Sequence, residues 1–280
     1  MSKSIAVLVC DTFSPVVLSE HGGYYVQITE LLHGAGKQLG VQDIAERCKL
    51  DEYDVREQMA YPTDEQLEGY AGLVITGSRA SAYEDIEWIN KLVDYTVHVA
   101  TTKPRIKIVG ICFGHQIVAR ALGGRCVKND RWEVAPTPVS LTALGKEIFG
   151  VDTLVRILHS FCPQILHQFI EMMHQDHVPE VPPTFHLLGS TDVSINQGMV
   201  RFNSPDALPP SPVSLSDIHI FTVQGHPEFH EGIVSKLVAM RAQSGILNGA
   251  VCADAIRRAR WQNDGVGVVG KTMLGIYGIV

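Results

Sequence analysis

Four short, almost uninterrupted apolar runs constrain the fold of this chain more than any other feature. They cover residues 5–10, 72–76, 106–111 and 218–223. Each is shorter than the ten or more residues expected of a buried helix, and polar or glycine residues follow it. A strand that is covered on both faces has this appearance, because neither face can carry polar side chains to water. The runs therefore predict buried strands of a largely parallel sheet.

Helical patterns lie between these runs in the first half of the chain. We expect helices over residues 24–33, 86–100 and 116–122, with the first stopped at residues 34–36 by two glycines. Residues 53–60 alternate in polarity and predict a further strand, and a short helix should end at residues 67–70. This alternation predicts an α/β fold, with a doubly wound, mostly parallel central sheet and helices on both faces.

The second half of the chain has a different pattern. Residues 128–212 are rich in proline and contain short alternating stretches, such as 185–188 and 194–196, which predict antiparallel strands and loops. Helices are expected over two segments beyond the last buried strand, at residues 231–241 and 250–261. Residues 272–280 form a final apolar stretch.

Composition excludes several classes of protein. The chain has 280 residues and a net charge of −7, so it lacks the basic surface expected of proteins that bind nucleic acid or anionic membranes. No apolar run reaches the roughly 20 residues that span a bilayer. The run at residues 5–10 is too short for a secretory signal, and Asp11 ends it. Its six cysteines form no Cys-x-x-Cys pair, which favours a reducing, cytoplasmic location with no zinc or dithiol site.

The turn around Cys112 carries most of the chemical information. Gly110 and Gly114 flank it between a buried strand and a helix, which is the arrangement of a nucleophile elbow. The sulfur would lie at the carboxyl edge of the sheet, beside a helix N-terminus whose dipole favours a thiolate. The backbone N–H of Phe113 would point to a developing oxyanion. A buried structural cysteine is the alternative, and we apply it to the five other cysteines.

A thiol nucleophile needs a base and a group that orients the base. His226 and Glu228 follow the strand at 218–223, and Pro227 between them stiffens the backbone. Residues two apart on an extended chain face the same side, so their side chains can touch. His226 lies 114 residues after Cys112, and only the fold can bring the two together.

The remaining histidines are expected to have ordinary structural roles. His174, His177 and His186, together with Asp176, raise the alternative of a metal site. That alternative is disfavoured, because their spacing fits no helical ligand pattern and prolines follow at positions 179, 182 and 183. We therefore expect neither a metal nor an organic cofactor.

Two motifs together resemble those of the class I glutamine amidotransferase family. One is Gly-Ile-Cys-Phe-Gly-His-Gln at residues 110–116, and the other is Gly-His-Pro-Glu-Phe at residues 225–229. The similarity is strongest to stand-alone members of the type of the γ-glutamyl peptidases of plants and fungi. It implies a flavodoxin-like fold, a catalytic domain over residues 1–242 and a C-terminal helical extension over residues 243–280.

The resemblance also implies roles for individual residues. Cys112 would form a γ-glutamyl thioester, with His226 and Glu228 completing a catalytic triad. Gly77 or Ser78 would supply a second oxyanion N–H beside that of Phe113. Substrate contacts are implied for three further residues, namely Gln116, His174 and Asp176.

One departure from the family bears on function. The loop at residues 77–79 is Gly-Ser-Arg, whereas amidotransferases fused to synthases usually carry Gly-Gly-Pro, and no synthase domain follows in this sequence. We therefore expect a free-standing hydrolase of small-molecule amides or γ-glutamyl compounds. The alternatives are a glutaminase subunit that supplies ammonia to a separate synthase, a tailoring enzyme acting on an amide-containing metabolite, and a non-catalytic binding protein.

Overall fold

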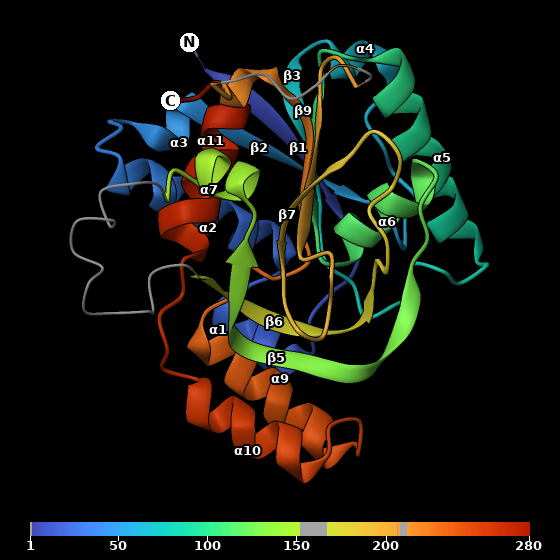
Figure 1. The fold of residues 1–280 in the computed structure, drawn as a ribbon. Helices are drawn as coiled ribbons and strands as arrows, with labels where there is room; N and C mark the ends of the chain where they lie inside the picture. Colours follow the sequence, from blue (N-terminus) through green and yellow to red (C-terminus); the bar gives the residue numbers. More distant parts are fainter. Residues whose placement is uncertain (1, 152–166, 206, 208–211) are drawn as a thin grey trace.

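The computed structural model describes residues 2–151, 167–205, 207 and 212–280, which form one nine-stranded sheet with helices on both faces (Figure 1). Five strands run parallel, and their order across the sheet is β2 (Cys48–Asp54), β1 (Lys3–Val9), β3 (Tyr70–Ile75), β4 (Lys107–Ile111) and β9 (Ile218–Val223). The antiparallel half continues through β8 (Gly198–Phe202), β7 (His186–Ser190), β5 (Val127–Leu141) and β6 (His167–His177). The predicted α/β fold is confirmed.

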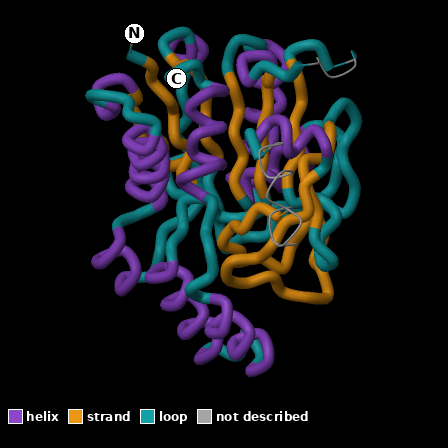
Figure 2. The backbone as a smooth tube through the Cα atoms, turned by 60° about the vertical axis from the view of Figure 1, so that its left-hand side comes forward, coloured by secondary structure: helices purple, strands orange, loops and turns teal. Residues whose placement is uncertain are grey.

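Helices cover the parallel strands on both sides, as Figure 2 shows from a second direction. One face is covered by α2 (Tyr24–Gln38), α3 (Ile44–Arg47), α7 (Ala143–Phe149), η3 (Gly265–Gly270) and α11 (Lys271–Ile276). The other face is covered by α4 (Asp64–Leu67), α5 (Glu87–Thr102) and α6 (Phe113–Ala121). A short 3-10 turn, η2 (Leu215–Asp217), precedes β9.

Strand β1 illustrates how the sequence builds these layers. Ile5 and Val7 are fully buried in the cluster under α2, whereas Ala6 and Leu8 are fully buried in the cluster under α5 and α6. Successive side chains point to opposite faces of a strand, so a continuous apolar run is what a doubly covered strand requires. The four apolar runs correspond to the central parallel strands.

A third apolar cluster lies beyond the carboxyl ends of the parallel strands. It joins β5 and β6 to α1 (Pro15–His21), α9 (Glu231–Gln243) and α10 (Gly249–Arg258). In Figure 1, β5 and β6 sweep beneath the main sheet, and α10 lies furthest from the two chain ends. The second half of the chain therefore covers the carboxyl edge of the parallel sheet.

The end predicted for the helix at residues 24–33 is wrong. Helix α2 runs on through Gly34 and Gly36 to Gln38. A Cβ at Gly36 would lie 2.4 Å from Ile44 Cγ1, and one at Gly34 would lie 3.2 Å from Val266 Cγ1. These glycines allow α3 and η3 to approach α2 closely, so they serve packing within the helix and do not stop it.

Two predicted strands are also corrected. The strand expected over residues 53–60 is β2, which begins at Cys48 and ends at Asp54, in parallel register with all of β1. Residues 194–196 belong to no strand, because Ser194 takes part in a turn with Thr191: the Thr191 N–H donates to the Ser194 carbonyl over 2.9 Å. Residues 185–188 correspond to β7, which spans His186–Ser190.

The last residues of the chain pack into the main body. Met273, Leu274 and Ile276 are buried against the same face as α2. The hydroxyl of Tyr277 donates to the carbonyl of Leu73 in β3 over 2.8 Å. The boundary at residue 242 stays a prediction. Across the described ranges, no helix has both the length and the apolar character needed to cross a membrane, and the cytoplasmic location also stays a prediction.

Candidate active site

Cys112 occupies a strained turn between β4 and α6. Its backbone has φ 52° and ψ −102°, a combination that residues with a side chain rarely adopt. Holding such a residue typically costs about 1–3 kcal/mol, and the surrounding structure must enforce it. Here the Cys112 N–H donates to the Val223 carbonyl in β9 over 2.9 Å. The elbow is thereby fixed to the neighbouring strand.

The glycines on either side of Cys112 are required by close backbone contacts. A Cβ at Gly110 would lie 2.6 Å from the carbonyl oxygen of Gly114. A Cβ at Gly114 would lie 2.2 Å from the carbonyl oxygen of Ile75 in β3. Any side chain at either position would push the helix away from the sheet. The elbow geometry expected from the sequence is therefore present.

His226 and Glu228 meet beside this turn. The His226 N–H donates to the Glu171 carbonyl in β6 over 2.8 Å, which fixes the backbone beyond β9. The Nδ1 atom of His226 lies 2.8 Å from Glu228 Oε1, and both side chains are buried. The ring of Phe229 stacks on the imidazole, with centroids 4.0 Å apart and planes inclined by 5°. The carboxylate and the stacked ring together fix the orientation of the imidazole.

The charges around His226 favour an imidazolium. Burial alone would lower the pKa of His226, but the Cys112 sulfur and the Glu228 carboxylate outweigh burial and raise this pKa to about 10. Cys112 and His226 line the same cavity, and the two side chains interact. The imidazolium is therefore the favoured form of His226 near neutral pH.

The loop after β3 closes one side of the elbow. Gly77 lies against His226, since a Cβ there would be 2.7 Å from Cε1 of the imidazole. Asp11, at the end of β1, anchors this loop: it accepts from the Arg79 backbone N–H over 2.7 Å and from Arg79 Nε and Nη2 over 2.9 Å each. Arg56 Nη1 adds a contact of 2.6 Å. Asp11 is buried, yet these bonds keep the pKa of its carboxyl below the ordinary value.

Two backbone donors near the sulfur have no acceptor. Within the described residues, no hydrogen bond uses the N–H of Ser78 or of Phe113. The N–H of Phe113 belongs to the first turn of α6, where such groups have no partner within the helix. Free donors of this kind bind an anion without first breaking another bond.

A cavity of about 480 Å³ opens above Cys112 and His226. Most of its walls come from the segment after β1, the loop after β3, strands β5 and β6, and helix α9 with the residues after it, while Tyr24 of α2 and Gln116 of α6 also contribute. Arg241 of α9 enters this cavity over the ring of Trp132, with the guanidinium carbon 5.0 Å from the ring centroid. The Nη1 atom of Arg241 is buried and has no hydrogen-bond partner among the described residues. The cavity therefore offers an unpaired cation near the predicted nucleophile.

Comparison with known proteins identifies the family of this chain. Residues 23–238 match the model of the family described as glutamine amidotransferase class-I. The chain belongs to that family. It is 32% identical over 260 residues to a glutamine amidotransferase-like protein of Schizosaccharomyces pombe, with 92% of each chain covered.

Two further proteins that are similar to this chain extend the comparison. Gamma-glutamyl peptidase 3 of Arabidopsis thaliana is 27% identical over 239 residues, which cover 84% of this chain and 81% of the relative. A crystal structure of a glutamine amidotransferase from Thermotoga maritima superposes with a TM-score of 0.64 and 14% identity, and 99% of each chain is covered. The latter likeness supports the fold, and the sequence relatives support the family.

The three residues expected to contact substrate all line the cavity above Cys112 and His226. Gln116 Nε2 donates to the Asp176 carbonyl over 2.9 Å and to Gln224 Oε1 over 3.2 Å. His174 has Nε2 3.2 Å from Glu133 Oε2, and its Nδ1 lies 3.1 Å from the Asp176 carbonyl. Burial raises the pKa of Asp176, whose Oδ2 accepts from the Ser81 hydroxyl over 2.5 Å. Six of the predicted site residues therefore line this cavity, namely Ser78, Cys112, Gln116, His174, Asp176 and His226, whereas Gly77, Phe113 and Glu228 are not part of its lining; the roles of all nine stay a prediction.

Several contributors to the site were not anticipated from the sequence. Gln224 lies 3.6 Å from the Cys112 sulfur through its Nε2, and its position two residues before His226 on extended chain is a signal that could have found it. Asp11 follows β1 at the carboxyl edge of the sheet, and a charged residue directly after a buried strand is a signal that could likewise have found it. Arg79 and Arg241 had none, because they reach the site only through the tertiary fold.

The residues considered for a metal site do not form one. Among the described residues, no group of three or more His, Cys, Asp or Glu side chains is arranged to hold a metal ion. Cys10, Cys48 and Cys126 are buried and Cys252 is partly buried, all as free thiols, whereas Cys162 lies outside the described residues. Burial raises the pKa of the Cys48 thiol to about 12, which disfavours reactivity there.

Proposed function

We propose that this chain is a cysteine hydrolase that cleaves a γ-glutamyl C–N bond through a thioester on Cys112. The proposal rests chiefly on the contact of His226 with Glu228 and on the interaction of His226 with Cys112, which lines an open cavity together with His226. A nucleophile, a base and an orienting carboxylate in this order are the requirements of acyl transfer.

The first half of the reaction forms the thioester. The Cys112 thiolate attacks the amide carbonyl carbon, a C–S bond forms, and the π electrons of the carbonyl move to its oxygen. The N–H groups of Phe113 and of Gly77 or Ser78 stabilise that oxyanion, and one such donor contributes about 3–4 kcal/mol in other enzymes. As the oxyanion collapses, the C–N bond breaks, and His226 gives its proton to the leaving nitrogen.

The second half releases the acid. Neutral His226 takes a proton from water, and the hydroxide attacks the thioester carbonyl. Collapse of this second oxyanion breaks the C–S bond, and the sulfur leaves as a thiolate beside the imidazolium. The net reaction consumes one water and yields a carboxylic acid and an amine, with Cys112 and His226 restored to their starting state.

The cavity favours a substrate that carries a carboxylate. Arg241 has an unpaired, buried guanidinium nitrogen, and burial lowers the pKa of Arg241, which is the sign of an unsatisfied cation. A γ-glutamyl group carries a free α-carboxylate that would pair with it. The name of the Arabidopsis relative, gamma-glutamyl peptidase 3, agrees with this substrate class.

The test uses matched pairs of substrates and variants. The wild-type protein should release free glutamate from glutamine or γ-glutamyl dipeptides, but not from the α-linked dipeptides. Cys112→Ser should abolish this release, whereas Cys252→Ala should keep it. Mass spectrometry should find the γ-glutamyl increment on the peptide that contains Cys112. Unchanged hydrolysis by Cys112→Ser would refute the mechanism.

A glutaminase subunit that feeds a separate synthase is the second candidate, and the family match favours it. It predicts that the isolated chain is nearly inactive and that hydrolysis appears only with a synthase bound. A non-catalytic binding protein would instead leave Cys112 inert to iodoacetamide, with no turnover under either condition. The same panel of γ-glutamyl compounds, assayed with the chain alone, separates the free-standing hydrolase from both alternatives, and labelling of Cys112 by iodoacetamide separates the glutaminase subunit from the binding protein.

A further inference from the structure

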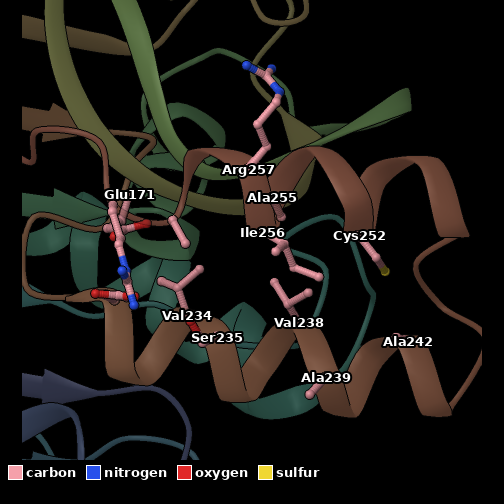
Figure 3. Close-up of a pocket in the computed structure, with 13 residues that line it drawn as sticks. Glu171, Val234, Ser235, Val238, Ala239, Ala242, Cys252, Ala255, Ile256 and Arg257 are labelled. Carbon is pink, nitrogen blue, oxygen red and sulfur yellow. The ribbon is translucent and has the colours of Figure 1, made fainter.

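A second cavity of about 530 Å³ lies between α9 and α10 (Figure 3), and none of its lining residues lines the active-site cavity. Small and apolar side chains of the two helices form most of its lining. Val234, Val238 and Ala239 come from α9, and Cys252, Ala255 and Ile256 come from α10. Ile256 is 72% exposed at the rim, and its side chain points toward Val238 in Figure 3. The trough is therefore apolar and open to solvent.

Glu171 of β6 lies at one end of this trough (Figure 3). Its side chain is 1% exposed, and its Oε2 atom has no hydrogen-bond partner in the described part of the chain. An isolated buried carboxylate is unfavourable unless a cation or donors accompany it. Nothing in the mechanism proposed above uses this carboxylate.

The other charged groups near Glu171 already have partners. Arg260 Nε lies 3.5 Å from Glu231 Oε1, and Arg257 Nη2 lies 2.5 Å from Asp254 Oδ1. Arg258 donates to Asp254 and to the backbone carbonyls of β5, so it stabilises the contact between α10 and β5. In the described part of the chain, Oε2 of Glu171 is therefore the one buried polar side-chain atom of this trough that lacks a hydrogen-bond partner.

We propose that this trough binds a small amphiphilic amine, with its ammonium group on Glu171 and its hydrocarbon part between α9 and α10. A primary ammonium donates up to three hydrogen bonds and would satisfy the unpaired oxygen. The volume lies within the range of pockets that hold small molecules. Burial raises the pKa of Glu171 to about 7, because it outweighs the opposing effect of His226 and Arg258.

The position of this site links it to the triad. The backbone carbonyl of the same Glu171 accepts the His226 N–H over 2.8 Å. A ligand on the Glu171 carboxylate would therefore bind the same residue whose backbone carbonyl holds His226. Glu171 itself lies outside the lining of the cavity that contains Cys112. It would occupy a separate site and would not compete with substrate for space.

The experiment measures binding of n-hexylamine by calorimetry at pH 8, with hexanoate and 1-hexanol as probes of equal chain length. Full-length Cys112→Ser is used beside wild type, so that the result does not depend on catalysis. We expect hexylamine to bind both proteins, hexanol to bind at least about tenfold more weakly, and hexanoate not to bind.

Variants locate the site. Glu171→Gln should weaken hexylamine binding about tenfold or more and leave the hexanol affinity unchanged. Ala239→Trp fills the trough from the exposed side of α9, so it should abolish binding of both probes and keep γ-glutamyl hydrolysis. Gln243→Trp, on the same helix but outside both cavities, should change neither. Equal affinity of Glu171→Gln and wild type for hexylamine would overturn the proposal, as would binding that survives in Ala239→Trp or no binding to wild type.

Discussion

The Cα atom of Gly77 lies so close to the His226 ring that no side chain fits between them: a Cβ would be 2.7 Å from Cε1. The loop after β3 and the segment after β9 are distant in the sequence, yet here each fixes the position of the other. The same loop carries one of the two proposed oxyanion donors, the N–H of Gly77 or Ser78, so this contact aligns the histidine with that donor.

Replacement of Gly77 should therefore damage catalysis more than folding. Gly77→Ala would push the imidazole away from Cys112 or shift the loop, and we expect kcat to fall by about 10²-fold, because small misplacements of reacting groups have effects of this size. Steady-state hydrolysis and the thermal midpoint should be measured together. Gly249→Ala is the control, since open space surrounds that glycine. Wild-type kcat in Gly77→Ala would show that the contact is unimportant.

The carboxylate of Glu228 can be tested by an isosteric change. Glu228→Gln keeps the size of the side chain but removes the charge that helps to hold the imidazolium. We expect kcat to fall by about 10²–10⁴-fold, as happens when the equivalent carboxylate is replaced by an amide in a serine protease triad. Alkylation of Cys112 by iodoacetamide near pH 7 should slow in parallel. An unaltered alkylation rate would contradict a coupled Cys112–His226 pair.

Asp11 should contribute to both stability and loop position. Asp11→Asn would leave the guanidinium and N–H of Arg79 without their anionic partner, and we expect unfolding free energy to fall by about 1–3 kcal/mol. The folded-state pKa of Asp11 is lowered, so its contribution should be present above its ordinary value of 3.8 and be lost as pH falls below it. Urea unfolding of both proteins at pH 7 and pH 3 measures this. A difference that persists undiminished at pH 3 would contradict the ionic explanation.

Arg241 should act on substrate affinity. Arg241→Met keeps the apolar part of the side chain over Trp132 but removes the unpaired cation. We expect KM for γ-glutamyl substrates to rise about tenfold or more with a smaller change in kcat, because a carboxylate contact distant from the reacting bond binds ground and transition states alike. Substrates amidated at the α-carboxylate should show no such difference. A pure kcat effect would assign Arg241 to another role.

Glu171 makes stability depend on pH in the opposite sense to Asp11. Its pKa is raised from 4.5 to about 7, chiefly by burial; His226 and Arg258 lower it, and Glu231 raises it. The folded state therefore holds a proton that the unfolded state releases, so stability should decline as pH rises from 4.5 to 7, by up to about 3 kcal/mol.

The comparison with Glu171→Gln isolates this effect. The variant cannot titrate, so its stability relative to wild type should improve as pH rises through this window and then level off above pH 7. Denaturant unfolding at half-unit pH steps measures the difference, and Glu65→Gln on the exposed surface should follow wild type. A constant gap between Glu171→Gln and wild type would rule out titration of Glu171 in this range.

The parts of the fold with a local signal were predictable from the sequence. The runs containing Val7, Val74, Val109 and Phe221 are apolar because both faces of their strands are covered. The elbow was predictable because Gly110 and Gly114 are forced by backbone contacts at a single turn. The family motifs identified the triad candidates for the same reason.

Elements that depend on distant partners were not predictable. Strand β2 lies at an edge of the sheet and exposes Lys49, Asp51 and Glu52. Polar and apolar residues therefore alternate less clearly in β2 than in the loop residues that follow it. Gly36 resembles a helix stop until Ile44 is placed against it. Likewise, no local pattern indicates that the N–H of His226 would meet the carbonyl of Glu171, which pairs β6 with the segment after β9.

The hydrogen bond from Tyr277 to Leu73 has a consequence for the order of folding. The ribosome synthesises β3 roughly 200 residues before α11, and β1 and α2 earlier still, so the apolar surface that α11 covers stays open to water until α11 has been made. The nascent chain must therefore stay soluble, by association with chaperones or by transient collapse, while one wall of its core is still missing. Full cooperativity of unfolding should appear only when residues 265–280 are attached.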